Sequence, residues 1–213
     1  MTGHLRGAGH EPFPGPPGPP RALLPDDAWH GWFALYDRVL VVTLAAVPLA
    51  ALAVWALARR RRAAGAAPAW ARRTALTEAG IVLAMLPALW LTMAPGADAG
   101  SVPGRVSLVP LQDLPHMGTV QTVGNLLILA VPGFLAPLRF RGLASLPRVL
   151  AAAAAASASI ETAQYVLQLD RVSSVDDVLL NTAGAGLAAL ASRRWWRDRR
   201  ERDLAASRRA AVV

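Results

Sequence analysis

The sequence predicts an all-α membrane protein, a polytopic transmembrane helical bundle of about five spans. Three observations support this fold class. Of the 213 residues, 54% are hydrophobic and only 17% are charged, and the mean hydropathy of +0.35 is unlike that of a soluble globular protein. Five apolar stretches have nearly the length that a helix needs to cross a bilayer. All 22 basic residues are arginine, and most of them gather between and after alternate stretches.

The chain is predicted to begin with a disordered arm over residues 1–28. Prolines and glycines dominate this segment, and proline cannot donate the backbone hydrogen bond that a helix needs. The start does not resemble a secretory signal peptide, because it lacks a short apolar run followed by a small-residue cleavage site. We therefore expect the first apolar stretch to remain in the mature protein.

Each apolar stretch is close to the ~20 residues that an α-helix needs to span a ~30 Å hydrocarbon core. The fourth is only moderately hydrophobic because it contains six consecutive alanines, and the fifth is interrupted by Asn181 and two glycines. Both are expected to pack against neighbouring helices through small residues such as Ala153, Ser157 and Gly184. The predicted spans are 39–57, 75–93, 120–138, 149–167 and 175–191.

The arginines predict how the bundle is oriented. Seventeen of them lie after the first, third and fifth spans, and five lie on the other side. The positive-inside rule then predicts a multi-pass protein of the cell membrane, with an extracytoplasmic N-terminus and a cytoplasmic C-terminus. The basic tail, residues 193–213, is expected to bind anionic lipid headgroups through Arg193–Arg209 rather than nucleic acid. Between arm and tail, residues 29–74 form the first helix with a basic loop, and residues 75–192 form a four-helix domain.

Polar side chains lie inside three of the predicted spans, in the half nearest the outside. Glu161 and Gln164 share one face of the fourth helix, and Asp177 and Asn181 share one face of the fifth. Ionisable groups are costly inside a membrane, so their convergence predicts one polar pocket. By contrast, Glu78 near the first basic loop is expected to have a structural role. The candidate ligand-binding residues are Asn125, Glu161, Gln164, Arg171, Asp177 and Asn181.

The order of these residues resembles that of the VanZ-like membrane proteins. The motifs are NLLILAVPGFLAPL from Asn125, ETAQ from Glu161, Arg171, then DVLLN from Asp177 with the glycines that follow, and SLVPLQDL upstream from Ser107. The resemblance covers roughly residues 106–191. Two departures concern the third helix, where the family's proline is displaced by one position and an aromatic residue is replaced by leucine.

The resemblance implies an integral membrane protein whose family is associated, through its founding member, with resistance to antibiotics of the teicoplanin type. It implies no catalytic activity. We therefore expect the pocket to bind or handle an amphiphilic cell-envelope molecule, either a lipid-linked precursor or the glycopeptide itself. In that case the Arg171 guanidinium would bind a phosphate or carboxylate.

Two other interpretations stay open from the sequence. Glu161, Arg171 and Asp177 are also compatible with a purely structural ion-pair network between helices. The other interpretation is a membrane enzyme or a flippase subunit. Candidate helix breaks near Pro132 and Gly184 would favour transport. No recognisable catalytic motif occurs, because the sequence has no cysteine nucleophile, no second aspartate cluster and no Ser/His/Asp order. No cofactor and no metal are predicted, although two adjacent aspartates lie at the start of the fifth helix and one histidine lies in an outer loop.

Overall fold

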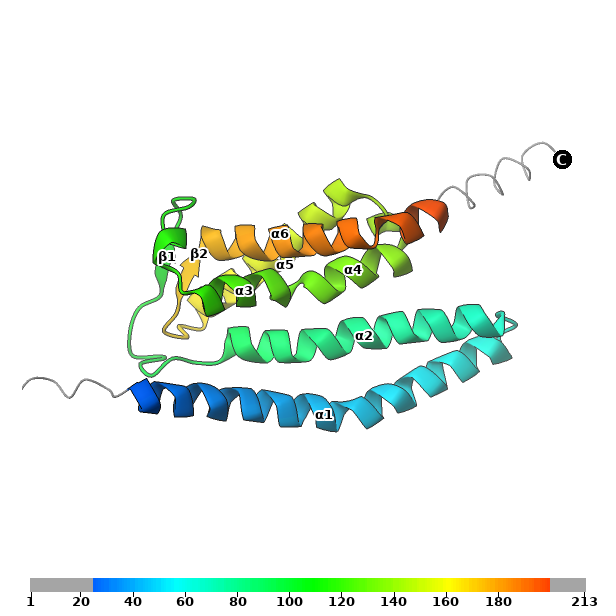
Figure 1. Ribbon diagram of the computed structural model, residues 1–213, viewed down its shortest axis with the longest axis horizontal. Helices are drawn as coiled ribbons and strands as arrows, with labels where there is room; N and C mark the ends of the chain where they lie inside the picture. The colour runs from blue at the N-terminus through cyan, green and yellow to red at the C-terminus, as the bar shows by residue number, and fades with distance from the viewer. Residues whose placement is uncertain (1–24, 200–213) are drawn as a thin grey trace, which may run out of the picture. The chain divides into compact units, whose positions relative to one another are not determined.

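The computed structural model describes residues 25–199, with side chains described from residue 39 onward. The predicted arm up to residue 24 and the predicted tail from residue 200 lie outside the described residues. Residues 39–199 belong to one compact unit, and the arrangement described below is that of this unit. In it, long helices run side by side, and a short pair of strands lies at one end (Figure 1).

The first two helices are α1 (Pro25–Ala63) and α2 (Pro68–Met93). Both begin with proline, which is well tolerated there because the first N–H groups of a helix have no partner within it. α1 continues past the predicted span into the first arginine run, whose positive charges favour the C-terminal end of a helix. Gly65 then closes the turn to α2 with a φ of 85°, a conformation that glycine adopts without strain.

The third predicted span consists of two helices, α3 (Thr119–Ile128) and α4 (Ala130–Arg139). The break at Leu129, where φ is −105° and ψ is 9°, has a local cause. Pro132 has no N–H to donate to the carbonyl of Ile128, and its ring crowds that carbonyl. The span therefore has the expected position. The sequence offered Pro132 and Gly184 as candidate helix breaks; the helix breaks beside Pro132, whereas α6 (Val175–Ala191) is continuous through Gly184.

The next two helices are α5 (Leu146–Val166) and α6 (Val175–Ala191). α6 lies so close to its neighbours that no side chain would fit at two positions. A Cβ atom on Gly184 would be 2.6 Å from the carbonyl carbon of Leu126, and one on Gly133 would be 2.6 Å from the Cα of Ala185. The predicted close approach at Gly184 is thus confirmed, because glycine allows membrane helices to pack backbone against backbone.

One end of the bundle is closed by a feature that the sequence did not predict. Strands β1 (Arg105–Ser107) and β2 (Val172–Ser174) pair in parallel, with Ser107 opposite Ser174. A short 3₁₀ turn, η1 (Leu114–His116), follows β1. We call this the ribbon end, and it comprises residues 94–118 and 167–174.

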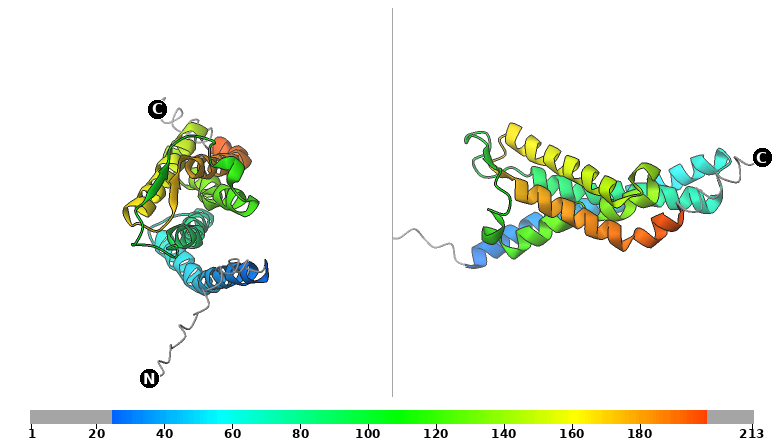
Figure 2. Two further views of the ribbon diagram at one scale, coloured as in Figure 1. Left: turned by 90° about the vertical axis from the view of Figure 1, so that its left-hand side faces the viewer. Right: turned by 90° about the horizontal axis from the view of Figure 1, so that it is seen from above.

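The opposite end is the basic end, comprising residues 59–73, 139–148 and 193–199, with the 3₁₀ turn η2 (Arg141–Leu143) between α4 and α5 (Figures 1 and 2). Among the described residues, the arginines predicted to share one side of the membrane lie here. Glu78 accepts hydrogen bonds from Arg61 and Arg139, each at 2.5 Å, so it has the structural role expected from the sequence. Arg199 donates to the carbonyls of Pro137 and Leu138, which caps the end of α4.

Small residues face inward and large apolar residues face outward. The core cluster consists of Leu129, Val149, Ala153, Ala185 and Ala189, whereas many large apolar side chains of α1, α2, α3 and α6 are exposed. A soluble protein rarely exposes such continuous apolar surface. Among the described residues, three helical segments are long and apolar enough to cross a membrane: Val39–Ala63, Pro68–Met93 and Thr119–Arg139. Together with α5 and α6, they form the predicted all-α membrane bundle.

Candidate functional site

The candidate site lies at and just inside the ribbon end. Three helix ends meet there: the C-terminal ends of α2 and α5 and the N-terminal end of α6, with α3 alongside (Figure 1). The α6 end is well defined because the side chain of Ser174 caps it, accepting a hydrogen bond of 3.1 Å from the Asp176 N–H. Two aspartates in the first turn of α6 complement the positive end of the helix dipole.

Asn125 and Asp177 form a direct contact between α3 and α6. The Asn125 amide donates to Oδ1 of Asp177 at 2.5 Å, and both side chains are half-buried. This is a charge-assisted hydrogen bond, which is shorter and stronger than one between neutral groups. These two predicted site residues therefore contact each other, and neither is fully buried.

Glu161 and Gln164 lie on the same buried face of α5 but contact different elements. Glu161 is 8% exposed and accepts a hydrogen bond of 3.0 Å from the Ser174 N–H, which ties α5 to the start of α6. Gln164 is 5% exposed and donates to the carbonyl of Thr92 at 2.8 Å, which ties α5 to α2. These two side chains hold three helix ends together.

Asn181 lies deeper in the bundle than the other predicted residues. It is 1% exposed and donates to the hydroxyl of Ser157 on α5 at 2.8 Å. Its Oδ1 atom has no hydrogen-bond partner among the described residues, and the same is true of the hydroxyl of neighbouring Thr182. The predicted small-residue face of α5 thus also supplies a polar contact.

Arg171 is the exposed member of the set. Its Nη1 atom donates to the carbonyls of Leu91 and Ala94 at 3.4 and 3.3 Å, at the C-terminal end of α2. The guanidinium also interacts electrostatically with Glu161 and Asp177. Within the described part of the chain it forms no salt bridge with either carboxylate. Sequence reasoning placed Arg171 among carboxylates, and the structure places its closest contacts on backbone carbonyls.

Asp176 is a central residue that sequence reasoning did not select. Its side chain is 1% exposed and accepts three backbone hydrogen bonds from the loop after β1. The donors are the N–H groups of Leu111 at 2.5 Å, Asp113 at 2.9 Å and Leu114 at 3.0 Å. The φ of 64° at Leu111 is unusual for a leucine, and the Asp176 contact holds that residue in place. No sequence signal distinguishes this aspartate from an ordinary helix-capping one.

Asp113, in the loop after β1, ties that loop to β2. The hydroxyl of Ser174 donates to Asp113 at 2.6 Å. Hydrogen bonds from Ser174 and then from Ser107 hold the pKa of the Asp113 carboxyl below its usual value. His116 contacts the carbonyl of Gln112 through Nδ1 at 3.4 Å. Within residues 39–199, no three histidine, aspartate or glutamate side chains gather as metal ligands would.

Comparison with known proteins identifies the family. The model of the VanZ/LLP1 family matches residues 79–196, a segment that is more than half of the chain and contains all six predicted site residues. No curated protein and no solved structure gives a significant match. The matched segment includes the region from which the resemblance was inferred and extends into α2. The chain therefore belongs to the VanZ/LLP1 family.

Proposed function

We propose that this membrane protein binds or handles an amphiphilic cell-envelope molecule at the ribbon end, with that end facing outside. The candidate ligands are a lipid-linked envelope precursor and a glycopeptide antibiotic of the teicoplanin type. The observation that carries the proposal is Arg171, an exposed cation beside two carboxylates at the end of the bundle opposite the arginine clusters. The same charge separation supports a cytoplasmic C-terminus.

The six site residues divide into two groups by burial. Glu161, Gln164 and Asn181 are buried, and each is hydrogen-bonded to another helix, a helix cap or a strand. We assign them to holding the helix ends in position. Asn125 and Asp177 are half-buried and Arg171 is exposed, so these three form the rim that a ligand headgroup can reach.

Arg171 is suited to binding an anion. Its two hydrogen bonds, at 3.3 and 3.4 Å, are longer than the usual 2.7–3.2 Å and are therefore weak. Both involve Nη1, which leaves Nε and Nη2 to form a bidentate contact with a phosphate or carboxylate. The neighbouring Asn125–Asp177 pair offers polar atoms to sugar or peptide groups. A headgroup that combines an anion with such groups fits this rim.

The test compares teicoplanin susceptibility of cells that express the wild type or single variants at matched membrane levels. We expect Arg171→Gln and Asp177→Asn to lose the protection that the wild type gives. Arg105→Gln is the matched control, because it removes an exposed arginine from the same end whose partner is Asp170 rather than a site residue. If both site variants accumulate normally and protect as well as the wild type, the site has no role in this phenotype.

A purely structural network is the second candidate, favoured by the buried contacts of Glu161 and Gln164. It makes a different prediction for variants of the two site carboxylates. Glu161→Gln and Asp177→Asn would then lower the membrane level and the melting temperature of the protein together. Any protein that remained would protect as well as an equal amount of wild type. Measuring accumulation, melting temperature and susceptibility on the same cells separates the two candidates.

A further inference from the structure

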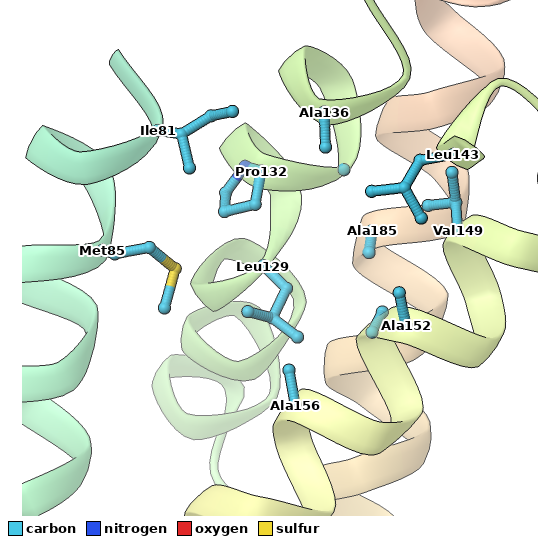
Figure 3. A pocket seen from close by; sticks show the side chains of 12 residues that line it. Ile81, Met85, Leu129, Pro132, Ala136, Leu143, Val149, Ala152, Ala156 and Ala185 are labelled. Atoms are coloured by element: carbon cyan, nitrogen blue, oxygen red, sulfur yellow. The ribbon is translucent and has the colours of Figure 1, made fainter. Parts of the chain in front are cut away.

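An apolar cleft of about 190 Å³ lies between α2, α4 and α5, with α6 behind it (Figure 3). Leu129, Gly133, Val149 and Ala185 are buried at its floor. The side chains that line the cleft are hydrocarbon, apart from the thioether of Met85. The cleft offers a ligand no polar side chain, so its occupant must be apolar.

The mouth of the cleft is on the surface of α5. Ala152 and Ala156 line the cleft and are exposed, because their short side chains do not close the gap toward α2. The surrounding outward-facing surface is apolar, so in a membrane the mouth opens to lipid chains. An apolar cavity of ~150 Å³ stays dry and takes up a molecule the size of benzene. A cleft of about 190 Å³ therefore has room for a segment of one hydrocarbon chain.

A cation lies in line with this mouth. Arg148, Ala152 and Ala156 follow one another at four-residue intervals and so share one face of α5. At ~1.5 Å per residue, Arg148 is about 6 Å from Ala152 and about 12 Å from Ala156 along the helix. Arg148 is exposed in the first turn of α5 at the basic end, with one long hydrogen bond of 3.4 Å to the carbonyl of Gly142. An anionic group bound there would point its chain along the mouth.

We propose that this cleft binds one acyl chain of an anionic phospholipid in the leaflet at the basic end, with the lipid phosphate on Arg148. The apolar walls favour an acyl chain as the occupant, and Arg148, aligned with the mouth, favours an anionic headgroup. This acyl-chain site and the ribbon-end site are separated along the bundle and use different residues. Either one can fail its test without affecting the other.

The test is photo-cross-linking of the purified full-length chain in lipid vesicles. The probe is phosphatidylglycerol with a diazirine on one acyl chain, compared with phosphatidylcholine that carries the same chain. Mass spectrometry then locates the adducts. We expect adducts concentrated at residues 149–156, with phosphatidylglycerol giving about fivefold more than phosphatidylcholine, the ratio typical of one arginine beside an anionic lipid.

Two pairs of variants test the two parts of the site. Ala152→Phe fills the mouth, whereas Ala155→Phe adds the same ring at an exposed position of α5 outside the cleft. Arg148→Gln removes the cation at the mouth, whereas Arg72→Gln removes another exposed arginine of the basic end.

We expect Ala152→Phe to lower cleft adducts about fivefold or more and Ala155→Phe to leave them unchanged. Arg148→Gln should abolish the preference for phosphatidylglycerol, and Arg72→Gln should preserve it. Equal labelling of the cleft and of other lipid-facing surfaces, or equal labelling of wild type by both lipids, would overturn the proposal. If Ala152→Phe melts well below wild type, Ala156→Leu repeats the test at the other end of the mouth.

Discussion

Replacing Asp176 with alanine is expected to destabilise the ribbon end strongly. The carboxylate is 1% exposed and accepts backbone hydrogen bonds from Leu111, Asp113 and Leu114. Asp176→Ala removes the acceptor of all three and leaves a small cavity in its place. The N–H of Leu111, a residue with a positive φ, then loses its hydrogen-bond acceptor.

The magnitude follows from these three contacts. A hydrogen bond to a charged group contributes about 1.5–3 kcal/mol, so three such bonds would contribute roughly 4.5–9 kcal/mol if all the donors stayed buried. The loop is partly exposed, and its N–H groups can bind water once the carboxylate is gone. The net loss is therefore about 3–5 kcal/mol. For a chain of this size, that loss lowers the melting temperature by roughly 6–20 °C.

The assay is thermal unfolding of the purified protein in detergent, followed by tryptophan fluorescence. Asp98→Ala is the matched control, because it removes an exposed carboxylate from the same end and should change stability by no more than about 0.5 kcal/mol. If Asp176→Ala melts within about 2 °C of this control, the reasoning about the carboxylate is refuted. Asp176 would then not be the residue that holds the loop.

Three further predictions concern packing, orientation and pH. Gly184→Ala should destabilise the bundle by about 1–3 kcal/mol, because the new Cβ would meet the backbone of α3. Gly124→Ala places its Cβ in open space and should instead stabilise the bundle by about 0.5–1 kcal/mol in the same melting assay. A cysteine at Ser101 should react with an impermeant thiol reagent added outside intact cells and one at Ala64 should not; the reverse pattern would invert the proposed orientation. Because its folded-state pKa is lowered, ionised Asp113 contributes stability above about pH 4 and loses that contribution as the pH falls through the folded value. The melting temperature of wild type should therefore fall more steeply with acidification than that of Asp113→Asn, and parallel curves would contradict this.

The features that the sequence predicted well depend on the length of apolar stretches, on the number of arginines in each loop and on local effects of glycine and proline. Apolar length placed the helices, and the end of α2 at Met93 is where it was predicted. Arginine counts identified the loops that meet at the basic end. Glycine and proline effects are local, so both the close contact of Gly184 and the break beside Pro132 were predictable.

The ribbon end was less predictable because its contacts join segments far apart in the chain. Ser107 and Ser174 give no strand signal in strands of three residues each, and they pair only once α5 and α6 are packed. Asp176 looks like any acidic residue in a first helical turn, since its three donors lie more than 60 residues earlier. Arg171 was recognised by its charge, but its contacts with α2 carbonyls depend on tertiary structure.

The long separation between the two strands also determines when the ribbon end can form during synthesis. β1 leaves the ribosome well before β2, and the loop after β1 needs an acceptor that lies at the start of α6. A contact between distant segments forms only after both segments have been synthesised, so the helices before α6 insert without these ribbon-end contacts. The contacts of the ribbon end can therefore form only after the start of α6 has been synthesised.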